Sequence, residues 1–351
     1  MTSPTQLATN RPRVALVQWA PADGISEAIG QELAGLGYAV APFLAGAPLP
    51  PADLVITFAP HGRWWPIAQQ VGALPPGRRP ALIHWGTEGF PDPRTPWPLI
   101  AALGRLRSAS EALEDSPAAG RRRLARTPLL RAYNRRLFRF RYVGDNLRAL
   151  ERGWLTALAD VSEWYARIYR EHGHPASFVP WGSAPSWHAD LGLERDIDVL
   201  WMGKRRNGRR SDLIDQVRRT LERQGVKMYV ADGVERPFIF GEERTRLLNR
   251  TKLTLNVRTR WFNSGFTFRF HTVAGNRCVV VSEPFMTHVS RYRAGEHYAE
   301  APADQLAEKI LHLLAHEDER RAIAERAYQL VTTEMTLRES VKQLLALVPS
   351  P

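Results

Sequence analysis

Short apolar runs alternate with amphipathic stretches along the first half of the chain. Four of these runs, at 13–19, 38–43, 53–58 and 81–85, are apolar over most of their length and are bounded by Pro, Gly or Asp. The stretches at 25–37 and 64–72 carry apolar residues at helical spacing. Apolar runs linked by helices are typical of a parallel sheet that is covered on both faces. The pattern therefore predicts an α/β fold.

The same alternation returns in the second half. An apolar run opens at DIDVLWMG, and further runs VKMYVA, KLTLNV and RCVVVS follow, separated by stretches with helical spacing. We predict two doubly wound, Rossmann-like domains that face a cleft. The expected divisions are a disordered tail at 1–12, an N-terminal domain at 13–180, a linker at 181–195, a C-terminal domain at 196–333, and a last helix with its tail at 334–351.

Composition favours a protein of the cytoplasm. Apolar residues make up 44% of the chain, and charged residues 24%, as is normal for a globular protein. No run reaches the roughly 18 apolar residues of a membrane span, and the N-terminus lacks the apolar core of a secretory signal. Cys278 is the only cysteine, so no internal disulfide forms. No Cys/His group has the spacing of a metal site.

The net charge of +12 is unevenly distributed. Residues 104–148 hold twelve arginines against four acidic residues, a balance of +8. We interpret this stretch as an Arg-rich helical insertion, in which Leu130, Tyr133, Leu137 and Phe140 form one apolar helix face. Three alternatives stay open: packing on its own domain, contact with acidic phospholipid through 121–141, and binding of nucleic acid, for which no recognised motif is present.

Two basic loops are candidates for an anion site. The loop GKRRNGRR follows the first strand of the second domain, and Gly203 and Gly208 in it let the backbone approach a phosphate. The segment NVRTRWFNSGFTFR leads into a helix, and its amides would form an anion site at the helix start. Glu283, just after the next strand, would contact a sugar hydroxyl or cap a helix. The candidate anion-binding residues are Gly203, Lys204, Arg205, Arg206, Arg258, Asn263, Ser264, Gly265, Thr267 and Arg269.

Residues 180–347 resemble the nucleotide-sugar-binding domain of GT-B glycosyltransferases of group 1 type, in particular the spore-maturation-type proteins of bacteria. The resemblance rests on VPWG, DVLWMGKRR, KLTLNVR and FRFHTVAGNRCVVVSEP. It implies that His271 stands where the family has a glutamate that holds the ribose hydroxyls, and Asn276 where it has a glycine. It also places Asn263 at a second acidic position. These departures raise the question of nucleotide identity and activity, although an imidazole can still bond a hydroxyl.

The resemblance implies a glycosyltransferase that moves a sugar from a nucleotide diphosphate donor to an unknown acceptor. An inverting enzyme would need a base in the N-terminal domain, and His61, His84 and Glu88 are the candidates, with Asp92 a further carboxylate. Asp196 and Asp198 open a strand, the wrong end for a ligand, so we expect no metal and no cofactor. Two alternatives remain: a non-catalytic relative, and a basic protein that binds nucleic acid or membrane on the same fold.

Overall fold

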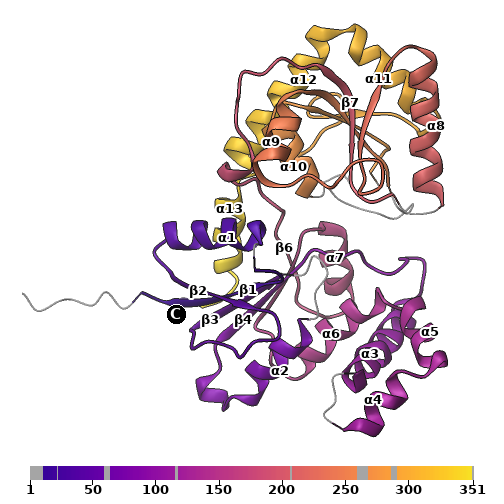
Figure 1. The fold of residues 1–351 in the computed structure, drawn as a ribbon. Coiled ribbons are helices and arrows are strands. Elements are labelled where there is room, and N and C mark those ends of the chain that lie inside the picture. The colour runs from indigo at the N-terminus through magenta and orange to yellow at the C-terminus, as the bar shows by residue number, and fades with distance from the viewer. Residues whose placement is uncertain are drawn as a thin grey trace, which may run out of the picture. The chain divides into compact units, whose positions relative to one another are not determined.

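A computed structural model describes residues 11–21, 23–58, 64–114, 118–205, 208–258, 268–285 and 291–349 (Figure 1). The chain divides into two compact units. Unit 1 comprises Met1–Val179 and Val341–Pro351, and unit 2 comprises Pro180–Ser340. The predicted linker at 181–195 therefore falls in unit 2, and the last stretch of the chain returns to unit 1.

Unit 1 is built on a parallel sheet with the strand order β2-β1-β3-β4-β5-β6. The order places β1 between β2 and β3, as expected for a doubly wound domain. The strands are β1 (Arg13–Gln18), β2 (Ala39–Leu44), β3 (Leu54–Phe58), β4 (Ala81–Gly86), β5 (Ala157–Asp160) and β6 (Ser177–Phe178). The four apolar runs of the first half are thus confirmed as strands.

Helices connect these strands and cover the sheet. They are α1 (Gly24–Gly35), α2 (Trp65–Ala73), α3 (Trp97–Glu114), α4 (Ala119–Ala125), α5 (Pro128–Arg136), α6 (Phe140–Glu151) and α7 (Glu163–Glu171). Asp23 caps α1, because its carboxylate accepts hydrogen bonds from the amides of Ile25 and Ser26. Ser162 caps α7 in the same way.

The Arg-rich stretch is helical, as predicted, but the single helix face expected from Leu130 to Phe140 is wrong. Helix α5 ends at Arg136, and a turn at 137–139 precedes α6. In α5 the buried side chain is Asn134, while Leu129 is 84% exposed. The apolar residues do have helical spacing, but the turn at 137–139 changes the direction of the chain, so they lie on two helices and not on one face.

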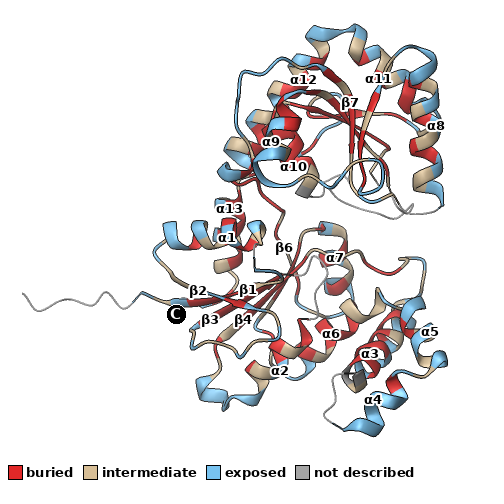
Figure 2. Ribbon diagram, in the orientation of Figure 1, coloured by how far each residue is buried: buried red, intermediate tan, exposed pale blue. Residues whose placement is uncertain are grey.

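Unit 2 has a second parallel sheet with the order β11-β10-β9-β7-β8. Its elements are β7 (Ile197–Met202), α8 (Arg209–Arg223), β8 (Met228–Ala231), α9 (Gly241–Asn249), β9 (Thr251–Asn256), α10 (Phe268–Gly275), β10 (Val279–Ser282), β11 (Ala299–Glu300), α11 (Leu306–Ala315) and α12 (Glu317–Gln329). Val199 and Trp201 join one core, and Leu200 joins the core on the opposite face. Both faces of β7 are therefore buried, as Figure 2 shows for the strands.

The division between the units falls within α13 (Leu337–Leu345). Within unit 2, the segment around Ser183 pairs with the segment that leads into α13. Ser183 exchanges backbone hydrogen bonds with Met335 and Leu337, each 2.8 Å long. Gly182 makes the approach possible, because a Cβ atom there would overlap the carbonyl group of Thr336. Among the described residues, no helix has the length and apolar character needed to cross a membrane.

Helices α3 and α6 approach so closely that their contact needs glycine. A Cβ atom on Gly144 would overlap the carbonyl oxygen of Gly104, and a Cβ atom on Gly104 would lie 2.9 Å from the carbonyl oxygen of Phe140. Backbone atoms cannot yield as a flexible side chain can, so the pair fixes the distance between the two helices.

We expect Gly144→Ala to lower the free energy of unfolding by about 1–3 kcal/mol, because the added methyl group overpacks this contact. Chemical denaturation followed by circular dichroism would measure the loss. Gly120→Ala in α4 is the matched control, since nothing lies within 4 Å of its Cβ position. Equal stability of the two variants would contradict this account of the α3–α6 contact.

Candidate functional site

The carboxyl ends of β7, β9 and β10 are where a doubly wound domain binds its ligand. In unit 2, Gly203 follows β7 with φ +124°, a conformation that favours glycine. Lys204 is exposed beside it. Arg205 is paired with the carboxylate of Asp215, and its Nε lies 3.9 Å from Asp232. The guanidinium of Arg205 is therefore engaged within the unit.

Glu283 organises two more of the candidate arginines. Its side chain is 1% exposed at the end of β10. It is paired with Arg209, accepts a 2.9 Å hydrogen bond from the backbone amide of Arg258, and lies 3.8 Å from the guanidinium of Arg258. The carboxylate thus ties the first residue of α8 to the loop after β9. This geometry gives Glu283 a role in holding the two loops together, and the predicted contact with a sugar hydroxyl stays a prediction.

Arg269, in the first turn of α10, has a different environment. No hydrogen bond or ion pair joins its guanidinium to any other residue that the structure describes. The group lies 5.4 Å from the ring of Trp201, and the guanidinium of Arg210 lies 4.7 Å from the same ring. A Cβ atom on Gly203 would overlap Arg269. Burial, and then the charge of Arg210, lower the pKa of Arg269 to about 10.

This setting is costly for a cation. At neutral pH the guanidinium still carries its charge, although it is partly withdrawn from water and no described carboxylate neutralises it. Such a group is compensated when an anion binds beside it. Arg269 therefore stays the main candidate for the predicted anion site at the carboxyl end of the unit 2 sheet.

His271 lies two residues further along α10 and is 1% exposed. Its Nδ1 atom is 2.9 Å from the hydroxyl of Tyr292. Burial lowers the pKa of His271 to about 3, so the ring is neutral at physiological pH. The bond to Tyr292 occupies one ring nitrogen, and the contact with a ribose hydroxyl implied by the resemblance stays a prediction for the other.

Asn276, where the resemblance implies glycine, is part of a buried hydrogen-bond network. Its amide donates to the carbonyl oxygens of Trp187 (3.1 Å) and Thr272 (2.7 Å). Its Oδ1 atom accepts from Asn249 (2.9 Å) and from the amide of Ala189 (3.2 Å). The side chain thus fixes the segment around 187–189 against α10. This departure from the family pattern is structural.

Several predicted residues lie outside the described part of the chain. They are His61, Arg206, Asn263, Ser264, Gly265 and Thr267. The expected anion site formed by amides at the start of α10 falls in the same segment, so it too stays a prediction.

In unit 1, His84 lies on β4 and is buried. Its Nδ1 atom is 2.9 Å from the hydroxyl of Thr57, and its ring stacks on Trp64 with centroids 4.2 Å apart. Burial lowers the pKa of His84 to about 3. The imidazole is therefore neutral and held between neighbours, a setting poorly suited to proton transfer. Asp92 lies on the following loop, where it is bonded by Arg94.

Glu88, two residues after β4, fits the role of a base better. Burial raises its pKa to about 7, against the opposing charges of Arg141 and Arg139 and a hydrogen bond from Tyr142. A carboxylate with a pKa near neutrality can accept a proton at physiological pH. Glu88 also lines a small cavity at the carboxyl ends of β4 and β5.

Sequence reasoning missed three other residues of that cavity: Asp160, Tyr142 and Asn146. Asp160 was detectable, because it is an acidic residue at the end of a predicted strand. Tyr142 and Asn146 lie on α6, inside the Arg-rich stretch, where the charge pattern drew attention away from them.

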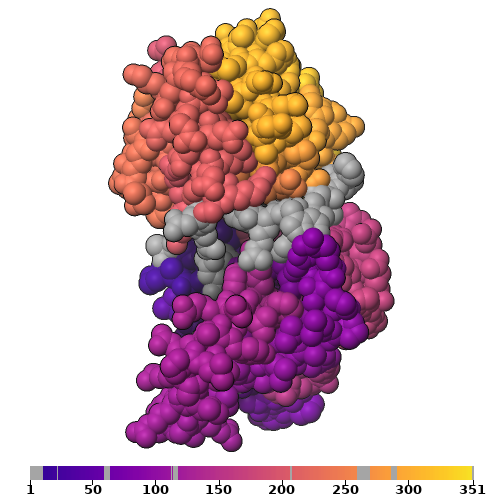
Figure 3. All heavy atoms as spheres, turned by 90° about the vertical axis from the view of Figure 1, so that its right-hand side faces the viewer, coloured from indigo at the N-terminus to yellow at the C-terminus, as the bar shows by residue number. Residues whose placement is uncertain are grey.

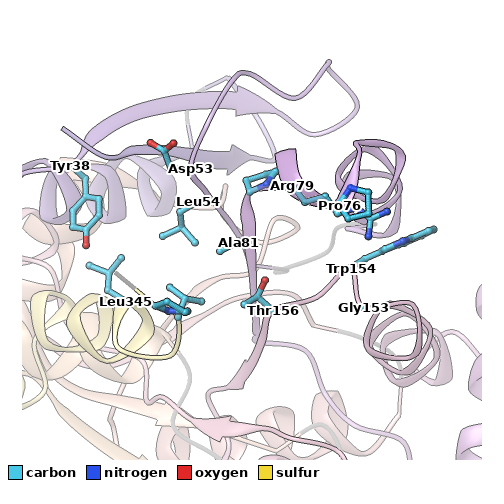
Figure 4. A pocket seen from close by; sticks show the side chains of 13 residues that line it. Tyr38, Asp53, Leu54, Pro76, Arg79, Ala81, Gly153, Trp154, Thr156 and Leu345 are labelled. Carbon is cyan, nitrogen blue, oxygen red and sulfur yellow. The ribbon is translucent and has the colours of Figure 1, made fainter. Parts of the chain in front are cut away.

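Figure 4 shows a larger cavity of unit 1, about 510 Å³ in volume. It lies at the amino ends of the strands, beside Leu54, Ala81 and Thr156, and Leu345 of α13 forms another part of its wall. Ligands of doubly wound domains bind at the opposite ends, so we assign no role in transfer to this cavity.

The two aspartates at the start of β7 are engaged in surface ion pairs. Asp196 pairs with Arg250, and Asp198 lies 2.7 Å from the ammonium of Lys252. Within the described ranges, no group of three or more His, Cys, Asp or Glu residues could hold a metal ion.

Comparison with known proteins identifies the architecture. Residues 206–346 match the family model described as glycosyl transferase-like. No curated protein sequence matches the chain. Among solved structures, sucrose-phosphate synthase from Thermosynechococcus elongatus is similar over 96% of this chain and 98% of its own, with 12% identity and a TM-score of 0.56.

Two further structures agree. WaaG, a glycosyltransferase involved in lipopolysaccharide biosynthesis, matches over 96% of this chain and 100% of its own, with 12% identity and a TM-score of 0.56. HepE from Anabaena, solved in complex with UDP-glucose, matches over 96% and 99%, with 8% identity and a TM-score of 0.52. The resemblance stated from the sequence is confirmed: the chain has the two-domain fold of the GT-B glycosyltransferases, and its residues 206–346 match the glycosyl transferase-like family.

Proposed function

We propose that the protein is a metal-independent glycosyltransferase that moves a sugar from a nucleotide diphosphate donor to an acceptor. In this proposal unit 2 binds the donor, unit 1 binds the acceptor, and the reaction takes place in the cytoplasm. The observation that carries the proposal is Arg269, a partly buried cation at the carboxyl end of the unit 2 sheet with no described counter-charge.

The chemistry of transfer requires such a group. When the glycosidic bond breaks, negative charge develops on the departing diphosphate, and a fixed cation in a site with little water stabilises it. Arg269 and Arg210, on the ring of Trp201, supply two positive charges without a metal ion. The similarity to HepE, whose structures hold UDP and UDP-glucose, supports a nucleotide sugar as the donor.

We expect Arg269→Met to weaken the binding of the preferred nucleotide diphosphate about 10- to 150-fold, because one charge-assisted hydrogen bond contributes about 1.5–3 kcal/mol. The stability of the free protein should not fall, since the variant removes a desolvated charge. Calorimetric titration with UDP, GDP, ADP and dTDP would measure both binding and its loss. Arg223→Ala, an exposed arginine at the end of α8, is the control.

If none of the four nucleotides binds the unaltered chain, or if Arg269→Met binds as tightly as Arg223→Ala does, the donor site is not at Arg269. The first outcome would favour a non-catalytic protein on the same fold.

Within the same proposal, Glu88 is the base that deprotonates the acceptor hydroxyl. Because the pKa of Glu88 is raised to about 7, the deprotonated and active form increases as pH rises through that value. Transfer should therefore rise about tenfold per pH unit below pH 7 and level off above it. Glu88→Gln should abolish this limb of the kcat/KM profile; a profile flat from pH 5 to 8 in the unaltered enzyme would exclude the role.

We also propose that the acceptor lies at a membrane, which the Arg-rich stretch of unit 1 contacts. Residues 118–140 contain eight arginines and no acidic residue, and seven of these arginines are exposed. Two aliphatic side chains stand among them, since Leu124 is 55% and Leu129 is 84% exposed. Figure 3 shows this part of unit 1 at the surface facing the viewer. Cationic groups around exposed leucines suit an acidic lipid surface, whereas nucleic acid would call for several exposed stacking aromatics, of which Phe138, 37% exposed, is one.

We expect the protein to sediment with phosphatidylcholine vesicles that contain phosphatidylglycerol, and not with phosphatidylcholine alone. Added salt should release it, because each arginine contributes only about 1 kcal/mol. The double variant Leu124→Ser, Leu129→Ser should lose much of this binding, whereas Leu191→Ser, Leu193→Ser, exposed leucines of unit 2, should not. Binding to DNA with no binding to vesicles would contradict the proposed lipid partner and favour nucleic acid.

A further inference from the structure

The cavity at the carboxyl ends of β4 and β5 is small and surrounded by polar groups. Its volume is about 20 Å³, room for a single hydroxyl or water oxygen. It is bounded by the residues after β4, by the end of β5, and by side chains from α6 and α7. The polar or ionisable side chains among its lining are His84, Thr87, Glu88, Tyr142, Asn146, Asp160 and Tyr169.

Asn146 is the group whose bonding is incomplete. Its side chain is 4% exposed, and its Nδ2 atom donates a 3.0 Å hydrogen bond to the hydroxyl of Tyr169. Its Oδ1 atom is buried without a hydrogen-bond partner. Turning the amide over would exchange the two ends, and one of them would still be unpaired. A buried amide end without a partner destabilises a fold, and it calls for a functional explanation.

Two carboxyl groups line the same space. One oxygen of Asp160 accepts a 2.8 Å hydrogen bond from the amide of Ser162. The other lies 2.8 Å from the position that a Cβ atom on Gly86 would take, so glycine at the end of β4 leaves room for it. Glu88 completes the set. The cavity therefore offers both acceptors and hydroxyl donors, and a group that can donate and accept hydrogen bonds suits it best.

We propose that this cavity is a subsite for one hydroxyl of the acceptor, a sugar or other polyol, and that Asn146 is the residue that recognises it. The inference rests on the proposed transfer reaction and adds to it the place and the chemical class of the acceptor group. A hydroxyl both donates and accepts, so it can satisfy the free end of the amide and one carboxyl oxygen together.

The test replaces the amide by an apolar side chain of the same shape. Asn146→Leu removes the unpaired polar end and also the bond to the hydroxyl of Tyr169, two opposing effects, so the fold should be kept with a small change in thermal stability. Saturation-transfer NMR on the complete chain would follow three probes: glycerol, methyl α-glucoside and methyl β-N-acetylglucosaminide. We expect transfer to at least one probe in the unaltered chain, and a fall of about tenfold in its affinity in Asn146→Leu, as for the loss of one hydrogen bond.

Asn134→Leu is the matched control. Asn134 is also buried in the Arg-rich region, but its Oδ1 atom accepts a 2.7 Å bond from Ser110 and it does not line the cavity. This variant should lose thermal stability and keep probe binding. The proposal is overturned if no probe contacts the unaltered chain, if Asn146→Leu binds probes as before and the cavity holds only water, or if both leucine variants lose binding alike.

Nucleotide binding separates this subsite from the donor proposal. Arg269→Met should lose nucleotide affinity and keep contact with the probes, and Asn146→Leu should do the reverse. Absence of nucleotide binding, together with probe contact that depends on Asn146, would count against the donor and not against this subsite.

Discussion

The guanidinium of Arg269, which meets no carboxylate among the described residues, is the constraint on which the proposed donor site of unit 2 depends. The guanidinium of Arg269 lies beside the ring of Trp201 and next to Gly203, and the guanidinium of Arg210 lies near the same ring. The turn must be glycine both for its φ of +124° and for the room that Arg269 needs. The backbone thus accommodates a cation that no described residue of the chain neutralises. A ligand is the component that would complete this arrangement.

The other basic residues of the same region show the contrast. Arg205, Arg209 and Arg258 each have an acidic neighbour, and Glu283 serves two of them. These pairs fix the loops after β7 and β9, because a buried carboxylate is stable only when cations and amides surround it. The arginines of this region therefore have two kinds of environment. Arg205, Arg209 and Arg258 are paired with carboxylates and hold the loops in place, and in the proposed function Arg269 binds an anion.

Much of the fold could be read from the sequence, because buried parallel strands produce apolar runs such as 53–58 and 81–85 whatever their neighbours are. The candidate anion-binding residues Gly203 and Arg269 could also be selected from the sequence, because they lie next to predicted strands and helices. The pairing of Arg205 with Asp215 was not, because charge in a loop does not reveal its partner. Asn146 was invisible for a related reason: an unsatisfied amide is defined by what surrounds it. The turn that ends α5 could not be seen in a helical spacing that continues through it.

The way in which the chain shares its last residues between the units has a consequence for biosynthesis. Val341–Pro351 completes unit 1, and the whole of unit 2 is encoded before it. On the ribosome, unit 1 therefore lacks its last segment while some 160 intervening residues emerge and condense. Unit 2 is a continuous stretch and can mature first, so the order of folding is expected to run against the order of translation.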